Sequence, residues 1–332
     1  MTYRIRQIIS FAGFLALFFI LVGCWLDDDN SDEIRSFKIV VVSDIHVRIP
    51  GNPDDDFYNN QVNLDNIQHA IDLINEYYSD ADFVTVTGDL VGCLFSEDPD
   101  DYLTGSENPA EKFKQMFDGL VPPYHVAFGN HDYYVGFDPD IDEHIITSNI
   151  DAVESVWKKV LGTDPYYSFV HKGIQMIFLN SNRGSTRFET CQGFEIEALC
   201  KGSFDPEQMA WLESCLKRSE PAIIFCHHPP GKDSDTVTSP LLNSYSIDPD
   251  DRFYEIAENY KDKILAIFAG HWHLWQEYTL FDSIAVYVTG AVGDPLGSSM
   301  NIYIVEIDTG PRSVQVERHH SANIRESILK LW

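Results

Sequence analysis

The sequence is poor in basic residues: it contains 23 Lys and Arg against 52 Asp and Glu, which gives a formal net charge of −29 at pH 7. Such a charge repels nucleic acid at long range and argues against a DNA- or RNA-binding role. It attracts cations instead, which suits a metalloprotein without proving one. Hydrophobic residues make up 44% and charged residues 23% of the chain. These are the proportions of a globular protein, and they exclude a disordered, collagen-like or multi-span membrane chain.

The sequence also lacks an apolar stretch at its N-terminus that is long enough to cross a bilayer. The apolar run at residues 8–22 is shorter than the roughly 20 residues that a spanning helix needs. It follows the basic residues Arg4 and Arg6, as the apolar part of a secretory signal does. An uncleaved signal anchor is the alternative interpretation.

The end of this run indicates what happens after export. It reads Leu21-Val22-Gly23-Cys24 and resembles the lipobox of bacterial lipoproteins, in which the cysteine is lipidated and becomes the new N-terminus. We therefore expect a lipoprotein signal peptide at residues 1–23, lipidation of Cys24 and an acidic tether at residues 24–36. The protein would then be exported and lipid-anchored at the bacterial cell envelope, facing the periplasm or on the cell surface.

Cysteine is scarce and not spaced as in a cysteine-rich zinc site. Six cysteines are present, and five remain once Cys24 is assigned to lipidation. Cys191 and Cys200 bracket a short polar segment, and an exported protein can form disulfides, so we predict a bridge between them. The odd count leaves at least one thiol unpaired, and Cys226, within an apolar run, is expected to be buried.

The sequence has no internal repeat and no long Pro- or Gly-rich linker, so residues 37–332 are predicted to form one domain. Five short apolar runs each end in a polar cluster, as buried strands do. The runs are residues 37–42, 83–87, 124–128, 222–226 and 264–269. Helical periodicity at residues 64–74 and 153–160, and a capped helix beginning at Asp205, separate some of them. Strands alternating with helices predict a layered α/β fold whose ligand site lies at the carboxyl ends of the strands.

The residue types in these clusters favour a metal site. Carboxylate oxygen and imidazole nitrogen suit Mn, Fe and Zn, and the absence of thiolates argues against a structural zinc site. Asp44-x-His46 and His271-x-His273 each place two candidate ligands on one side of an extended chain. A lone histidine is more often a packing or surface residue than a ligand, but several such clusters at strand ends indicate a metal or catalytic site.

The ordered set of motifs resembles the calcineurin-like metallophosphoesterase family over roughly residues 37–310. The motifs are Asp44-x-His46, Gly88-Asp89, Gly129-Asn130-His131-Asp132, His227-x-Pro229 and Gly270-His271-x-His273. The resemblance implies a layered β-sandwich flanked by helices, with a dinuclear metal site at the carboxyl ends of the strands. The two ions would be divalent or trivalent Mn, Fe or Zn, and their identity is left open.

The resemblance also implies a role for each matched residue. Asp44, His46 and His273 would hold one metal ion, Asn130, His227 and His271 would hold the other, and Asp89 would bridge both. His131 would stand near the leaving group as a catalytic residue, and Asp132 would orient or charge it. His228 is expected to be a neighbour rather than a ligand. The histidines that match no motif are expected to be packing or surface residues: His125, His144, His171, His319 and His320.

These roles predict a metal-dependent hydrolase that attacks phosphate mono- or diesters with a metal-bridging hydroxide. Purple acid phosphatases carry a tyrosine at the position of Gly92 and lack the histidine found at His46, and both differences argue against that branch. Because the protein is expected to be exported, an external phosphate ester is the expected substrate. The alternative is a non-catalytic metal-binding module of the same fold. A metal titration with and without a chromogenic phosphodiester separates the two.

Overall fold

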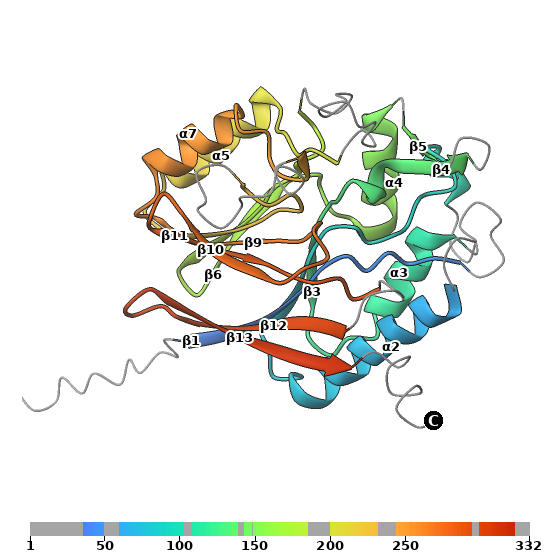
Figure 1. Cartoon of the computed structure of the whole chain (residues 1–332), viewed down its shortest axis with the longest axis horizontal. Helices are drawn as coiled ribbons and strands as arrows, with labels where there is room; N and C mark the ends of the chain where they lie inside the picture. The colour runs from blue at the N-terminus through green and yellow to red at the C-terminus, as the bar shows by residue number, and fades with distance from the viewer. Residues whose placement is uncertain are drawn as a thin grey trace, which may run out of the picture. The chain divides into compact units, whose positions relative to one another are not determined.

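Two β-sheets lie face to face and carry helices on their outer faces (Figure 1). The structure is a computed structural model that describes eight segments of the chain. They are residues 36–49, 60–102, 108–138, 143–147, 149–184, 200–231, 244–293 and 299–322. The predicted signal peptide, Cys24, most of the predicted tether and Cys191 lie outside these residues, so the predictions made for them are untested.

The first sheet has five strands in the order β13-β12-β1-β2-β3. Its strands are β1 (Ser36–Val42), β2 (Phe83–Thr87), β3 (Tyr124–Ala127), β12 (Ser299–Asp308) and β13 (Ser313–Ala322). β1, β2 and β3 run parallel, whereas β12 is antiparallel to both β1 and β13. The parallel strands therefore end at one edge of the sheet.

The second sheet has six strands in the order β10-β11-β9-β8-β7-β6. Its strands are β6 (Tyr167–His171), β7 (Ile174–Phe178), β8 (Ala222–Phe225), β9 (Ile264–Ala269), β10 (Gln276–Leu280) and β11 (Ile284–Val288). β7, β8, β9 and β11 run parallel, and the edge strands β6 and β10 are antiparallel to their neighbours. A separate hairpin is formed by β4 (Tyr134–Asp138) and β5 (Glu143–Ile146).

The alternation of side chains along the strands builds three apolar layers. In β1, Ile39 and Val41 point into the core between the sheets, and Val40 and Val42 point to the outer core beneath the helices. All four side chains are fully buried or nearly so. A strand that is covered on both faces is typical of a parallel sheet between layers, which explains why the sequence shows unbroken apolar runs.

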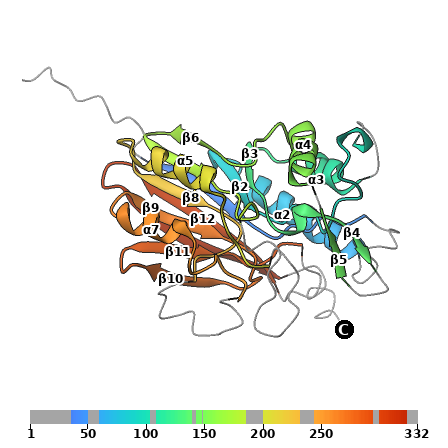
Figure 2. The ribbon, with the colours of Figure 1, turned by 90° about the horizontal axis from the view of Figure 1, so that it is seen from above.

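Five α-helices in the described residues cover the two outer faces. They are α2 (Asn60–Tyr77), α3 (Pro109–Phe117), α4 (Ile150–Leu161), α5 (Pro206–Leu216) and α7 (Arg252–Asn259). The first three pack on the outer core of the five-stranded sheet, and α5 and α7 pack on that of the six-stranded sheet. Figure 2, seen from above, shows α5 and α7 lying over strands of the six-stranded sheet, with α3 and α4 grouped away from them. The predicted layered α/β sandwich flanked by helices is confirmed.

Helix α5 has the N-cap and the first-turn proline that the sequence predicts, but its capping-box glutamine has a different role. Asp205 is its N-cap, its carboxylate accepts the Gln208 backbone N–H, and Pro206 occupies the first turn. The Gln208 side chain, which stands at the capping-box position, instead exchanges two hydrogen bonds with the backbone of Asn180 at 2.8 and 2.9 Å. The glutamine thus joins α5 to the end of β7 rather than closing the cap.

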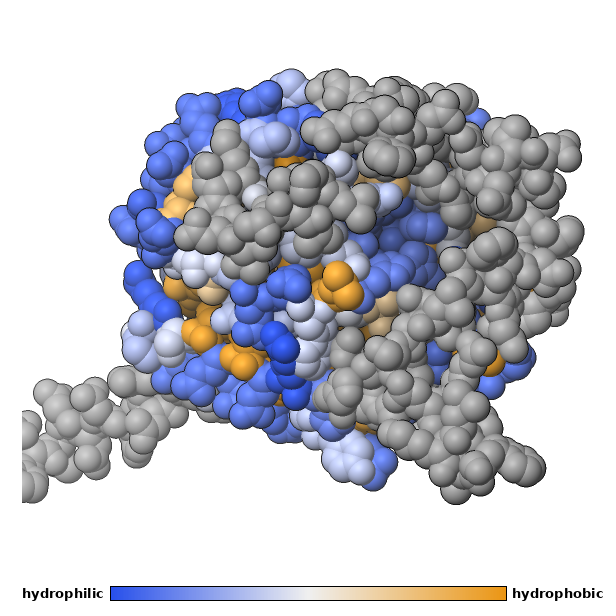
Figure 3. Space-filling model, in the orientation of Figure 1, coloured by the Kyte–Doolittle hydropathy of each residue, from blue (hydrophilic) through white to orange (hydrophobic). Residues whose placement is uncertain are grey.

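The outer surface agrees with the acidic composition. In the face shown in Figure 3, hydrophilic residues cover most of the coloured surface, with smaller apolar patches between them. None of the helices in the described part of the chain combines the length and hydrophobicity that crossing a bilayer requires.

Candidate metal centre

The predicted site residues lie in the loops that follow five parallel strands. Asp44 and His46 follow β1, Asp89 follows β2, Asn130 follows β3, His227 follows β8, and His271 and His273 follow β9. The loops meet because β1, β2 and β3 end at one edge of the first sheet, while β8 and β9 end at the adjoining edge of the second. Backbone hydrogen bonds join them: Asp44 N–H donates to Gly88 O, and Gly270 N–H donates to His227 O.

Several of these residues adopt a backbone conformation that L-amino acids rarely occupy. Asp44, His46, Asp89, His271 and His273 have φ angles of 53°, 49°, 53°, 71° and 52°. Left-handed conformations cost free energy outside glycine, and they gather at functional sites where the surrounding structure enforces them. Here the alternation turns both members of Asp44-x-His46 and of His271-x-His273 toward the site, while Ile45 and Trp272 between them are buried.

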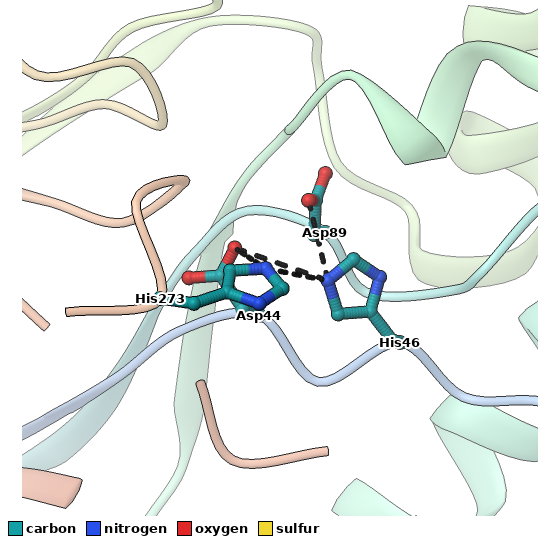
Figure 4. A group of neighbouring side chains, drawn as sticks. All are labelled: Asp44, His46, Asp89 and His273. Atoms are coloured by element: carbon teal, nitrogen blue, oxygen red, sulfur yellow. Dashed lines mark hydrogen bonds and ion pairs between the residues drawn. The ribbon is translucent and has the colours of Figure 1, made fainter. Parts of the chain in front are cut away.

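One group of side chains consists of Asp44, His46, Asp89 and His273, which offer ligand atoms that all lie within 4.8 Å of one another. His46 Nε2 is 3.1 Å from His273 Nε2 and 3.5 Å from an oxygen of Asp89. His273 Nε2 is 3.3 Å from Oδ1 of Asp44. Figure 4 shows the four side chains pointing toward one another from three different loops. Such convergence of carboxylates and imidazoles is the arrangement of a divalent-metal site.

A second group consists of Asp89, His227 and His271, again with ligand atoms within 4.8 Å of one another. His227 Nε2 lies 3.2 Å from Oδ2 of Asp89 and 3.0 Å from the amide oxygen of Asn130. The Asp89 carboxylate therefore belongs to both groups. The side chains of Asp44, Asp89, Asn130 and His227 are almost completely buried.

The hydrogen bonds of two histidines fix which ring nitrogen faces the second group. His227 donates through Nδ1 to Thr87 O at 2.9 Å, and His271 donates through Nε2 to Cys200 O at 2.8 Å. A neutral imidazole has one N–H, so the remaining nitrogens carry lone pairs. Those nitrogens, Nε2 of His227 and Nδ1 of His271, are 3.1 Å apart. Two lone pairs at this distance need a shared cation, either a proton or a metal ion, and carbonyl acceptors of this kind commonly orient metal-binding histidines.

Burial and neighbouring charge set the protonation of the ligand atoms. Burial holds the pKa of His46 and of His271 well below the usual value, so both rings are neutral at pH 7, the form that binds metal. Burial alone would raise the pKa of Asp89, but the imidazoles of His227 and His131 hold it well below its usual value. Burial opposes protonation of His227, yet the Asp89 carboxylate raises its pKa to about 9. The proton on Nε2 of His227 is the cation that a metal ion would replace.

The glycine beside Asn130 allows the loops to approach closely. A β-carbon on Gly129 would lie 2.1 Å from Oδ1 of Asp89, and one on Gly88, whose φ is +105°, would lie 2.4 Å from Nδ1 of His227. Neither position tolerates a side chain without displacing a candidate ligand. Steric crowding therefore explains why a glycine precedes Asp89 and another precedes Asn130.

His131 lies beside the two groups and is held from two directions. Its backbone N–H donates to Oδ1 of Asp89 at 3.0 Å, and its ring Nδ1 lies 2.7 Å from Gly92 O. The ring also packs edge-on against His46, with centroids 4.5 Å apart. The contact with the Gly92 carbonyl places the proton on Nδ1 and leaves Nε2 as the nitrogen that can exchange a proton with a substrate.

The expectation that Asp132 orients or charges His131 stays a prediction, and the structure shows which groups the Asp132 carboxylate contacts. Its carboxylate is fully buried and accepts the backbone N–H groups of Leu90, Val91 and Gly129, at distances of 2.8, 3.2 and 2.8 Å. Its partners are backbone groups because the loops after β2 and β3 converge on it. Asp132 thus ties together the loops that carry Asp89 and His131.

A sixth strand end contributes polar residues that the motif search missed. Asn180, Ser181 and Asn182 follow β7 and are buried. The Ser181 hydroxyl is 2.7 Å from Nδ1 of His228, whose ring packs against His271 at a centroid distance of 4.4 Å. His228 is therefore a neighbour of a candidate ligand, as expected. The apolar run before Asn180 carried the same strand-end signal as the other five, but amides and a hydroxyl do not stand out as metal ligands.

The comparisons with known proteins agree with this geometry. The family model described as calcineurin-like phosphoesterase matches residues 37–274. A dimetal phosphatase from Danio rerio has a similar structure, with a TM-score of 0.53 and 13% identity over 84% of this chain and 98% of that one. A calcineurin-like phosphoesterase from Bacillus subtilis matches with a TM-score of 0.47 and 13% identity, over 86% of this chain and 90% of that one. No curated protein matches the sequence significantly.

The carboxylate, amide and imidazole atoms assembled here fit a divalent metal site, and the family match indicates one. The sequence-predicted ligands are brought together in full: every one of the seven lies in one of the two groups or within hydrogen-bonding distance of a member. At 13% identity the Danio rerio structure supports the fold alone.

Proposed function

The chain belongs to the calcineurin-like phosphoesterase family, and on that premise we propose that it hydrolyses phosphate mono- or diesters with two metal ions held by the two groups. Asp44, His46 and His273 would hold one ion, Asn130, His227 and His271 the other, and Asp89 both. The observation that carries the proposal is the Asp89 carboxylate, whose Oδ2 lies 3.5 Å from Nε2 of His46 in one group and 3.2 Å from Nε2 of His227 in the other. A single carboxylate between two ligand groups is what a two-ion site requires.

The metal ions would supply an activated water and would neutralise charge on the phosphoryl oxygens. The protein's own residues do the rest. Asp89 also accepts the His131 backbone N–H, so it sets the place of the imidazole relative to the ligand groups. Nε2 of His131 can then protonate the departing oxygen or stabilise charge that develops on it.

The experiment is a substrate screen with the purified full-length chain. The protein is freed of metal, reloaded with Mn, Fe or Zn, and assayed against phosphomonoesters, phosphodiesters, cyclic nucleotides and phospholipid head groups, with the metal content measured for each preparation. Activity that requires metal and reaches a maximum near two ions per chain supports the proposal. Metal binding without hydrolysis of any ester would instead favour a binding module.

We also propose where the protein is located, and the sequence of its N-terminal segment supports this proposal. Residues 1–23 act as a lipoprotein signal peptide, Cys24 carries the lipid, and residues 24–36 tether the enzyme to the bacterial envelope, so the substrate is an external phosphate ester. A clickable fatty acid should label the wild type and Cys215→Ala, whose buried thiol lies in α5, but not Cys24→Ala. Equal labelling of Cys24→Ala would exclude lipidation at this residue.

A further inference from the structure

Gly92 supplies the carbonyl that lies 2.7 Å from Nδ1 of the His131 ring, yet nothing in its own conformation explains the glycine. Its φ does not lie in the left-handed region, which most residues avoid. The reason is spatial. A β-carbon on Gly92 would lie 3.1 Å from Cγ of Arg48 and 3.3 Å from both Cζ and Nε. The Arg48 side chain therefore lies along Gly92 and fills the space that a side chain at position 92 would need.

The path of the chain after β1 holds Arg48 in this place. Val47 forms a parallel bridge with Val91, and the Gly92 N–H donates to Val47 O at 3.1 Å. The Arg48 N–H donates to Oδ1 of Asn63 at 3.2 Å, and Asn63, fully buried in α2, also donates to Ile45 O and Gly293 O. Arg48 itself is only 7% exposed. The buried Arg48 side chain is thus packed, through Cγ and the guanidinium, against the residue whose carbonyl orients the ring of His131.

A carbonyl group on glycine is a weakly fixed acceptor, because a residue without a β-carbon restricts the rotation of its peptide groups least. Gly92 N–H is anchored to Val47 O and the Val91 N–H to Asp132, whereas the Gly92 carbonyl is hydrogen-bonded to the His131 ring. The Arg48 side chain, whose Cγ, Nε and Cζ border the space beside Gly92, adds a steric restraint on this residue.

We infer that Arg48 is a positioning residue for His131: by packing on Gly92 it fixes the carbonyl that holds the imidazole Nδ1–H, and so keeps Nε2 directed at the leaving group. The inference rests on the proposed function for its kinetic consequence. It deepens that function by naming the substrates for which Arg48 matters. Esters with poor, alkyl-type leaving groups need a proton from His131, whereas p-nitrophenyl esters leave as stable anions and need it far less.

The kinetic test compares Arg48→Ala with wild type on matched alkyl and p-nitrophenyl esters of whichever mono- or diester class is hydrolysed. We expect kcat to fall about tenfold for the alkyl ester and less than about twofold for the p-nitrophenyl ester, with KM unchanged, because a displaced catalytic group lowers kcat. Arg48→Met keeps most of the stem and should recover much of the loss. Arg252→Ala, which removes an exposed arginine in α7, is the control and should match wild type.

A double-mutant cycle separates positioning from independent action. If Arg48 acts through His131, the variant Arg48→Ala/His131→Asn should be no slower on the alkyl ester than His131→Asn alone. Gly92→Ala should reproduce a weaker form of the same selective loss, because its β-carbon pushes the Arg48 side chain by a few tenths of an ångström. This variant keeps the test open if Arg48→Ala fails to fold.

A second readout does not depend on activity. In metal-free protein with labelled histidine, nitrogen-15 spectra should show the His131 ring as the Nδ1–H tautomer in wild type and Arg48→Met. Arg48→Ala should show faster exchange of that proton or a mixture of tautomers. An unchanged His131 signal in folded Arg48→Ala would overturn the inference, and so would equal losses on both esters or additive losses in the cycle. If wild type hydrolyses no ester, the proposed function fails, and the spectra still decide the role of Arg48.

Discussion

Two groups of histidines in the described part of the chain have different surroundings, and the contrast shows what distinguishes a candidate ligand. The rim group, at the carboxyl ends of the strands, comprises His46, His131, His227, His271 and His273. The interior pair, His125 at β3 and His171 at the end of β6, packs among aromatic rings. His125 lies 5.3 Å from Phe83 and 4.4 Å from Phe169 between ring centroids, and His171 lies 4.8 Å from Phe37.

Burial does not distinguish the two groups. It lowers the pKa of His46 and His271 at the rim, and it equally lowers the pKa of His125 in the interior, to about 4. The difference lies in what surrounds the ring. In each rim histidine, a ring nitrogen lies near a carboxylate, a second imidazole or a backbone carbonyl. The ring of His125 instead packs against aromatic rings. A neutral buried imidazole is a ligand only where other donors converge on its lone pair.

The largest expected effect comes from removing the carboxylate that both rim groups share. Asp89→Asn keeps the shape of the side chain but removes its charge, and we expect turnover to fall by about a thousandfold, the upper end for loss of one preorganised electrostatic group. Metal content should fall in the same preparation. His125→Gln is the matched interior control and should retain activity. Near-normal turnover in Asp89→Asn would exclude its role between two ions.

Within the rim, His131 should behave differently from the ligands. His131→Asn removes the only ring in this group assigned to proton transfer, and turnover should fall by about a hundredfold while metal content stays that of wild type. Steady-state kinetics and metal analysis on one preparation check both parts. Loss of metal together with activity would show that His131 is a ligand or supports one, and would overturn the assignment.

Metal removal should affect the rim and leave the interior unchanged. Metal ions that bind only the folded state at 100 times their Kd stabilise it by about 2.7 kcal/mol per site, so a chelator should lower Tm by a few degrees. The shift should persist in His125→Gln and largely disappear in Asp89→Asn. Thermal unfolding with and without chelator measures it, and an equal shift in both variants would place the metal away from Asp89.

The convergence of the candidate ligands could be predicted from the sequence, because each of them follows an apolar strand and parallel strands end at the same edge of a sheet. Asp44-x-His46 and His271-x-His273 needed only strand periodicity to place both side chains on one side. The contacts of Asp132 could not be predicted, because two of the three backbone N–H groups that it accepts belong to residues some forty positions away, brought near only by folding. The same holds for Arg48 and Gly92, whose contact depends on the bridge between Val47 and Val91.

The strands outside the motifs were harder to identify. β12 and β13 form a long antiparallel pair at the edge of the first sheet, and the exposed positions in β13 break the apolar run that marked the central strands. The helix predicted from residues 64–74 extends to Asn60–Tyr77 as α2, because polar residues at helix ends carry no periodic signal. Sequence patterns thus locate buried elements well and partly exposed ones poorly.

The interior histidine offers the smallest and most specific test of the comparison. Burial lowers the pKa of His125 to about 4 in the folded protein, below the value of about 6.5 in an unfolded chain. Between these two values the unfolded state binds more protons, so the contribution of His125 to stability is lost as the pH falls from 6.5 toward 4. His171 adds to the shift, and the ring of His125 also borders a cavity of about 280 Å³ with Asp164 and Tyr167.

His125→Phe keeps the aromatic packing and removes the titration, so it should be less sensitive to acid than wild type. The full shift corresponds to about 2 kcal/mol between pH 6.5 and pH 5, and partial exposure of the ring reduces the expected difference to about 1 kcal/mol. Urea unfolding of both metal-free proteins at the two pH values measures this difference in the free energy of unfolding. Metal is removed so that the rim histidines titrate in the same way in both proteins. Parallel losses of stability would show that the interior histidine is not held neutral by its aromatic surroundings, and the contrast with the rim would then rest on ligand geometry alone.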